Sequence, residues 1–151
     1  MKFYSRAAFS EYHRGRAWIL FLLYAGLIFF LSHQPGDPSR LPPFPHFDKF
    51  EHFIAYFVFA TLLQRALYYS DIRRLMMAIT LGAAILYGIS DEFHQSFIPN
   101  RQADFFDLVF DTLGAAFGIL TFQSTLSSRE RDPLFPGALP SEPADETNNE
   151  A

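Results

Sequence analysis

Residues that could carry acid-base, cation-binding or metal-binding chemistry are gathered in one stretch, YGISDEFHQSFIPNRQADFFDLVFD, at residues 87–111. Its ionisable and amide side chains are Asp91, Glu92, His94, Gln95, Arg101, Asp104, Asp107 and Asp111. Water is the usual environment of such side chains, yet the apolar runs LMMAITLGAAILYGIS and LGAAFGILTF flank the stretch, and both suit hydrocarbon or a buried core. We therefore expect a polar site at a membrane surface.

A second set of polar residues occurs in DKFEHFIAYF, at residues 48–57. The helical period of 3.6 residues stacks Asp48, His52 and Tyr56 on one face of a predicted helix, with Lys49 beside them. Three polar side chains therefore follow one another along a single helical stripe.

A third polar pattern occurs at the start of the last apolar run. Asp104, Asp107 and Asp111 follow the spacing i, i+3, i+7 and so share one helical face. Gly114 and Gly118 continue that face with the small-xxx-small spacing that lets two helices approach closely. An Asp at the centre of a bilayer costs roughly 2.5–3.5 kcal/mol on insertion scales. We therefore expect these carboxylates to face the bundle interior, where they are paired, protonated or in a water-filled cleft.

Four apolar runs must position these residues. They occupy residues 17–31, 50–69, 75–89 and 105–122 of a chain of 151 residues that is 50% hydrophobic and contains 19 Phe. A soluble amphipathic helix would show a polar face on every turn, so we predict an all-α membrane bundle of four transmembrane helices, with a buried soluble bundle as the alternative. The proline-rich segment at 32–49 predicts an ordered or extended loop, and the segment at 90–104 a loop with a partial helix that ends before Pro99.

The distribution of the 12 Lys and Arg residues predicts the orientation of the bundle. On one side are Arg40, Lys49 and Arg101, and the remaining nine lie at the N-terminus, between residues 65 and 74, and after the fourth run. Because basic residues collect on the cytoplasmic side, both termini are predicted to be cytoplasmic and the polar site to face outward.

The sequence divides into a basic cytoplasmic N-terminus at 1–16, a four-helix membrane domain at 17–126 and a disordered, proline-rich, acidic tail at 127–151. The first apolar run resembles a signal sequence without a small-x-small cleavage site, so we expect an uncleaved anchor. The absence of cysteine excludes disulfides and thiolate chemistry. No basic stripe with interleaved aromatic residues occurs outside the apolar runs, so no nucleic-acid partner is expected.

The polar residues allow two interpretations. In the first, Lys49 and Arg101 neutralise the carboxylates in a structural network that fixes helix register. In the second, the carboxylates outnumber these two cations, and the excess beside His52 and His94 favours a metal ion, a proton or a cationic ligand. No HExxH or comparable metal-binding spacing occurs. No cofactor is therefore assigned, and a divalent metal ion stays open.

The paired motifs DK-x-x-HF-x-x-Y and G-x-SDE-x-HQ with R-x-AD-x-x-D make residues 18–122 resemble the VanZ-like family of bacterial membrane proteins, named for a member associated with teicoplanin resistance. The resemblance implies a multi-helix membrane domain and supplies no mechanism. It directs attention to Asp48, Lys49, His52, Tyr56, Asp91, Glu92, His94, Gln95, Arg101, Asp104, Asp107 and Gly114. Asp111 stands where many relatives carry Asn.

Three functions stay open for a multi-pass protein of the cytoplasmic membrane with membrane lipids as partners, and the oligomeric state stays open too. The leading hypothesis is a cell-envelope protein whose outer-facing pocket binds a polar headgroup or amphiphile, such as a lipid-linked or glycopeptide ligand, and modulates teicoplanin sensitivity. The first alternative is an integral-membrane enzyme acting on a lipid or lipid-linked phosphate. Its acid-base candidates are His52, His94, Asp91 and Glu92, with Arg101 and Lys49 holding the anion. The second alternative is a small transporter in which Asp107 and Asp111 relay protons.

Overall fold

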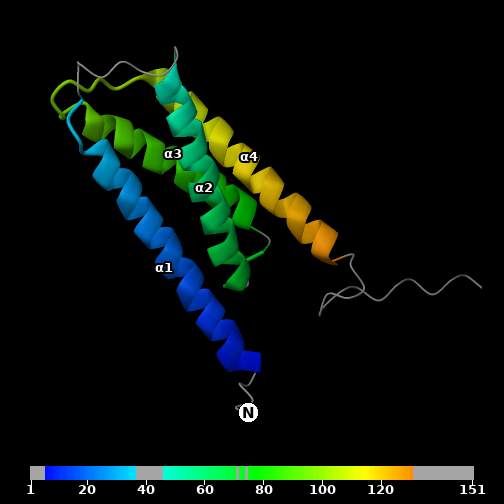
Figure 1. Ribbon diagram of the computed structural model, residues 1–151. Coiled ribbons are helices and arrows are strands. Elements are labelled where there is room, and N and C mark those ends of the chain that lie inside the picture. The colour runs from blue at the N-terminus through cyan, green and yellow to red at the C-terminus, as the bar shows by residue number, and fades with distance from the viewer. Residues whose placement is uncertain (1–5, 37–45, 71, 74, 131–151) are drawn as a thin grey trace, which may run out of the picture.

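The computed structural model describes residues 6–36, 46–70, 72, 73 and 75–130, which form four helices and no strand. The helices are α1 (Arg6–Ser32), α2 (Phe47–Tyr69), α3 (Met76–Gln95) and α4 (Phe105–Glu130). Consecutive helices run in opposite directions, so α1 begins and α4 ends at the same end of the bundle (Figure 1). The prediction of an all-α fold is confirmed.

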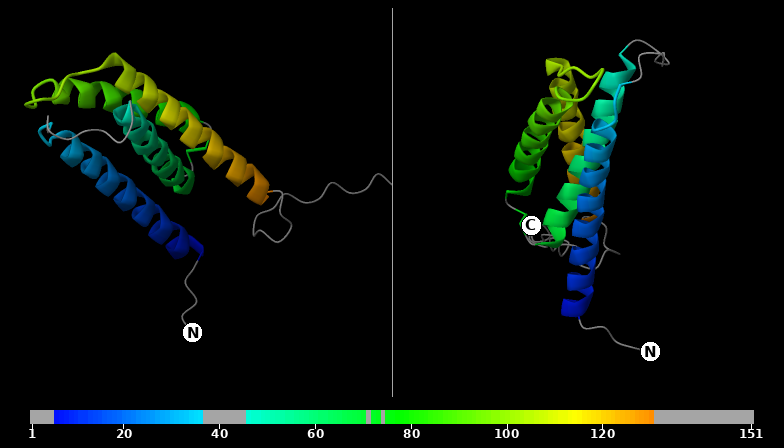
Figure 2. Two further views of the ribbon diagram at one scale, coloured as in Figure 1. Left: turned by 45° about the horizontal axis from the view of Figure 1, so that its top comes forward. Right: turned by 90° about the vertical axis from the view of Figure 1, so that its left-hand side faces the viewer.

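Helix α2 is the central element, because its contacts with the other helices are the most extensive in the bundle. Its pairing with α4 is the most extensive, and α1 packs against α2 and α3 (Figures 1 and 2). The apolar core follows α2 and includes Tyr56, Phe59, Ala60, Leu63, Leu67, Ala84, Ala115 and Ile119. The polar residues of α2, in DKFEHFIAYF, and the carboxylates at the start of α4 therefore lie on helices that pack directly against one another.

Helices α2 and α4 approach closely where α4 carries glycine. A Cβ atom added to Gly114 would lie 2.2 Å from the backbone oxygen of Phe53, and one added to Gly118 would lie 2.5 Å from the backbone oxygen of Phe57. Both distances are shorter than any ordinary carbon-oxygen contact. The close contact predicted for this face is confirmed.

The outer surface of the bundle is apolar and its interior is partly polar. Leu22, Leu23, Phe30, Leu86 and Leu120 are each at least 60% exposed. The buried polar residues are Ser32, Lys49, Gln64, Thr80, Asp91, Glu92, Gln95, Asp107 and Asp111. Soluble proteins show the opposite distribution, whereas lipid-facing helices show this one.

Three helical segments are long and apolar enough to cross a membrane: Glu11–Ser32 in α1, the whole of α3, and Phe105–Ser128 in α4. Helix α2 is not among them. It carries charged residues near both ends and a glutamine, Gln64, that is fully buried. Of its polar side chains, Lys49, His52 and Gln64 bond to neighbouring helices. Asp48, Glu51 and Arg65 are exposed.

The helices are longer than the apolar runs that predict them. Helix α1 begins at Arg6 and α4 continues to Glu130. Helix α3 continues to Gln95, so the partial helix predicted within residues 90–104 is a direct extension of α3. A turn then ends α3, with the amide of Ile98 donating to the carbonyl of Gln95 at 2.9 Å just before Pro99. Half of the predicted loop at 32–49, residues 37–45, and most of the predicted tail lie outside the described residues.

Candidate polar site at the end of the bundle

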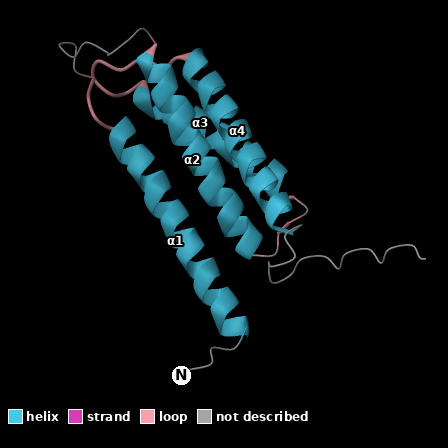
Figure 3. Ribbon diagram, turned by 45° about the vertical axis from the view of Figure 1, so that its right-hand side comes forward, coloured by secondary structure: helices cyan, strands magenta, loops and turns pink. Residues whose placement is uncertain are grey.

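Four chain segments meet at the end of the bundle that holds the described residues of the α1–α2 connection and the loop between α3 and α4 (Figure 3). The last turn of α1, the first turns of α2, the last turns of α3 and the first turns of α4 all contribute polar side chains. Asp104 starts α4, because its Oδ1 accepts a hydrogen bond from the amide of Phe106 at 2.8 Å. This cap fixes the start of the helix whose next turns carry Asp107 and Asp111.

The ammonium group of Lys49 is shared by three carboxylates. Its Nζ donates to Oδ2 of Asp48 at 3.0 Å, to Oδ1 of Asp107 at 2.6 Å and to Oδ2 of Asp104. Burial alone would lower the pKa of Lys49, but its hydrogen bonds with Asp104, Asp107 and Asp48 outweigh that effect and raise the pKa. The bond from Lys49 lowers the pKa of Asp104. Lys49 therefore stays charged and ties the start of α2 to the start of α4.

His52 forms a second connection between α2 and α4. Its Nδ1 lies 2.8 Å from Oδ1 of Asp111, and its Nε2 lies 3.8 Å from Oδ2 of Asp107. A carboxylate can only accept a hydrogen bond, so the geometry assigns the proton to Nδ1 and leaves a lone pair on Nε2 of the neutral ring. An Asp–His pair of this kind orients an imidazole for general-base catalysis or for metal binding.

Asp91 belongs to a separate group between α1 and α3. Its Oδ2 accepts a hydrogen bond from Oγ of Ser32 at 2.8 Å and one from Nε2 of Gln95 at 3.1 Å. All three residues are buried. This group holds the end of α1 against the end of α3 without a cation among its described partners.

Three buried side-chain atoms have no hydrogen-bond partner within the described part of the chain: the hydroxyl of Tyr56, Oε1 of Glu92 and Oδ2 of Asp111. The other oxygen of Glu92 accepts the amide of Asp104 at 2.7 Å. Gly88 leaves room for two of the three atoms, since a Cβ there would lie 2.9 Å from Oδ2 of Asp111 and 3.5 Å from the hydroxyl of Tyr56. Buried polar atoms are normally satisfied, so each of these calls for water, an ion or a proton.

Two cavities border the polar groups. One, of about 370 Å³, has apolar lining from Ile28, Leu31 and Ala55. Its polar lining is Ser32, Gln34, Asp48, Glu51, His52, Tyr56, Asp91, Gln95 and Arg101. The other, of about 470 Å³, is lined by His46, Asp48, Lys49, Asp104, Phe106 and Phe110. Asp48 borders both cavities, so the two lie on either side of the start of α2.

The structure brings most of the predicted site residues to this end of the bundle, in three groups. Asp48, His52, Tyr56, Asp91, Gln95 and Arg101 line the first cavity, and Lys49 and Asp104 line the second. Glu92, Asp107 and Asp111 are buried between the helices.

Two predicted residues have other partners. Nε2 of His94 lies 3.1 Å from Nδ1 of His33, and the His94 ring packs against Phe29. His94 is therefore not paired with the groups around His52. Nε of Arg101 donates to the carbonyl of Gln34 at 3.3 Å, and within the described residues Arg101 forms no ion pair with a carboxylate. The predicted neutralising role of Arg101 is not seen there.

Several lining residues were not predicted from the sequence. Ser32 and Gln34 follow the first apolar run directly, in SHQ, and that position was the available signal. Glu51 lies three residues after Asp48, which places it on the same helical face. The apolar lining residues carry no signal, because the same residue types cover the whole outer surface.

Two trios of side chains have the composition of a metal site. One ligand atom from each of His52, Glu92 and Asp107 lies within 4.8 Å of the others, and the same is true of Asp48, Asp104 and Asp107. The second trio already surrounds the ammonium group of Lys49. Only the first combines an imidazole with two carboxylates, and of its members Asp107 alone is bound to Lys49.

Comparison with known proteins identifies a family. The family model described as VanZ/LLP1 matches residues 17–126. No curated protein matches the chain, and no solved structure matches it.

Proposed function

The chain belongs to the VanZ/LLP1 family and is a multi-pass membrane protein, and we propose that its polar cavity binds the headgroup of an amphiphile. The observation that carries this proposal is the lining of the 370 Å³ cavity, which is polar on the side of His52 and Asp91 and apolar at Ile28 and Leu31. A molecule with one polar and one apolar part matches such a lining.

The charge of the lining favours one class of headgroup. The described lining of the cavity contains three carboxylates, those of Asp48, Glu51 and Asp91. Arg101 is the one Lys or Arg side chain in that described lining. An amine or a set of hydroxyl groups would satisfy these acceptors, whereas a headgroup that carries only negative charge would be repelled. Glycopeptides of the teicoplanin type carry such groups, and modulation of teicoplanin sensitivity is the role that the family name suggests for this cavity.

The membrane topology that we propose has α2 as a fourth spanning helix and both termini in the cytoplasm. Its support is the antiparallel arrangement of the helices, which places the described basic residues Arg14, Arg16, Arg65 and Arg73 toward the end away from the cavity. The cavity then faces outward, where envelope ligands are present.

Filling the cavity tests the proposal. Ala55→Phe places a ring where the apolar lining lies, and Ala78→Phe makes the same substitution at an exposed position of α3. Calorimetric titration of the purified proteins with teicoplanin, and with lysophosphatidylethanolamine as a second amphiphile, should show at least tenfold weaker binding for Ala55→Phe alone. Equal binding by both variants, or no binding by the wild type, would exclude the cavity as the binding site.

A second candidate function is favoured by the hydrogen bond of 2.8 Å between His52 and Asp111. It leaves Nε2 of a cavity-lining imidazole free to act as a general base toward a lipid or lipid-linked phosphate. In that case His52→Gln should cause one substrate lipid to accumulate in cells, whereas Ala55→Ser should not. Unchanged lipid composition in both strains would contradict the enzyme hypothesis.

A further inference from the structure

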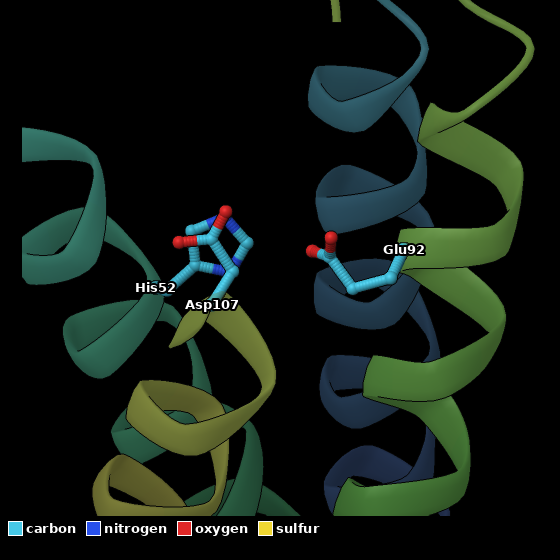
Figure 4. A group of neighbouring side chains, drawn as sticks. All are labelled: His52, Glu92 and Asp107. Atoms are coloured by element: carbon cyan, nitrogen blue, oxygen red, sulfur yellow. The ribbon is translucent and has the colours of Figure 1, made fainter. Parts of the chain in front are cut away.

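We propose that His52, Glu92 and Asp107 bind one divalent transition-metal ion at the junction of α2, α3 and α4. The three residues come from three different helices and point toward one another, with the carboxylate of Glu92 directed from α3 toward His52 and Asp107 (Figure 4). This site goes beyond the amphiphile cavity, although His52 contributes to both.

The spacing of the ligand atoms fits a metal ion after a small adjustment. Three atoms within 4.8 Å of one another have a common centre no more than 4.8/√3, or about 2.8 Å, from each atom. Zinc lies about 2.0–2.2 Å from histidine nitrogen and carboxylate oxygen. Side-chain rotations that bring each atom inward by roughly 0.7 Å would therefore complete the site.

The second observation is the unsatisfied oxygen of Glu92. Oε1 is buried without a partner in the described residues, and the whole residue is only 8% exposed. The hydrogen bond from the amide of Asp104 to Oε2 holds the carboxylate in place. A metal ion would supply the missing partner of Oε1.

The environment of His52 is that of a metal ligand. Its Nδ1 donates to Asp111, which is fully buried, and this bond presents the lone pair of Nε2 on the side of Asp107. Metal-ligating histidines characteristically donate their other nitrogen to a carboxylate in this way. Asp107 serves two cations at once, with Oδ1 bound to Lys49 and Oδ2 facing His52.

The donor set selects the class of metal. An imidazole with two carboxylates suits Zn²⁺ and its neighbours in the first transition row, whereas Mg²⁺ and Ca²⁺ prefer oxygen ligands alone. Three protein ligands leave at least one coordination position open, as in catalytic rather than structural zinc sites.

Zinc titration of the purified full-length protein, stripped with a chelator and kept in detergent, tests the proposal. The wild type should bind one equivalent of Zn²⁺, and excess Mg²⁺ should not displace it. Glu92→Gln should weaken binding at least tenfold, and Asp111→Asn should weaken it roughly 10–100-fold through the orientation of His52. The control Asp91→Asn, which changes a buried carboxylate outside the trio, should bind like the wild type.

A second measurement covers variants that fold poorly. Zinc should raise the apparent melting temperature of the wild type and of Asp91→Asn but not that of His52→Asn. The proposal would be overturned if the wild type bound zinc no more tightly than Glu92→Gln, or if Asp91→Asn weakened zinc binding as much as Glu92→Gln does. Oε1 of Glu92 would then hold a water molecule or a proton. Because these titrations measure zinc binding alone, their failure leaves amphiphile binding by the cavity untouched.

Discussion

Replacing Gly114 with alanine tests the closest approach of two helices in the bundle. The added Cβ would lie 2.2 Å from the carbonyl oxygen of Phe53 and 2.9 Å from its carbonyl carbon, whereas relaxed carbon-oxygen contacts begin at about 3.3 Å. The clashing atoms belong to the backbone of α2, so no side chain can rotate out of the way. Helices α2 and α4 must therefore separate by about 1 Å at this level.

The size of the effect follows from two opposing contributions. Overpacking typically costs about 1–3 kcal/mol, and the higher helix propensity of alanine offsets at most about 1 kcal/mol. The separation would also stretch the bonds from Lys49 and His52 to Asp107 and Asp111, which cross the same interface. We therefore expect a loss near the upper end of the range, about 2 kcal/mol after the offset.

Thermal denaturation in one detergent, at one heating rate, measures this loss. Gly114→Ala should lower the apparent melting temperature by roughly 4–8 °C, at about 2–4 °C for each kcal/mol. The matched control is Gly82→Ala, where an added Cβ meets no atom within 4 Å, and it should melt at or above the wild-type temperature. A Gly114→Ala protein as stable as Gly82→Ala would refute the close packing of α2 against α4.

Three further predictions concern the charged groups and the topology. Lys49→Met leaves Asp107 buried without its cation, so it should destabilise the protein by about 3 kcal/mol. The double variant Lys49→Met/Asp107→Asn should regain part of the melting temperature that Lys49→Met loses. A double variant that regains none of it would contradict the pairing. Lys49 lowers the pKa of Asp104, so the stability from that pair is complete above the ordinary carboxyl pKa of about 4 and is lost as the pH falls through the lower folded-state pKa. Melting curves between about pH 6 and pH 2 should show this acid loss in the wild type and a smaller one in Lys49→Met. Parallel losses in the two proteins would contradict the pairing of Lys49 with Asp104. Since the chain has no cysteine, Gln102→Cys should react with a membrane-impermeant maleimide in intact cells and Ser127→Cys should not, and the opposite labelling would reverse the proposed orientation.

The helical period was sufficient to predict which residues of α2 and α4 share a face. Asp48, His52 and Tyr56 border one cavity, and Asp107 and Asp111 are buried against α2. Regular spacing within one helix gives this information because side chains three and four residues apart lie on the same side.

The period could not resolve the polar residues around the end of α3, because the segment at 90–104 was predicted to be a loop with only a partial helix. Asp91 and Glu92 are neighbours in sequence, yet Asp91 binds Ser32 of α1 while Glu92 accepts the amide of Asp104. His94 packs beside His33 instead of facing His52. The direction of each side chain depends on where α3 ends, and the apolar pattern gives no signal for that boundary.

The partner of Arg101 was also beyond the sequence. Its described hydrogen bond is to a backbone carbonyl, that of Gln34, and every peptide unit offers such a group. Charge complementarity alone therefore gave no signal for this partner.

The pairing of α2 with α4 imposes an order on biosynthesis. Lys49 precedes Asp107 by 58 residues and His52 precedes Asp111 by 59. At translation rates of about 5–20 residues per second, α2 waits roughly 3–12 s for these partners. During that interval Lys49 and His52 lack the α4 carboxylates of Asp107 and Asp111 to which they bind in the folded protein. The polar end of the bundle therefore closes only when the last helix docks.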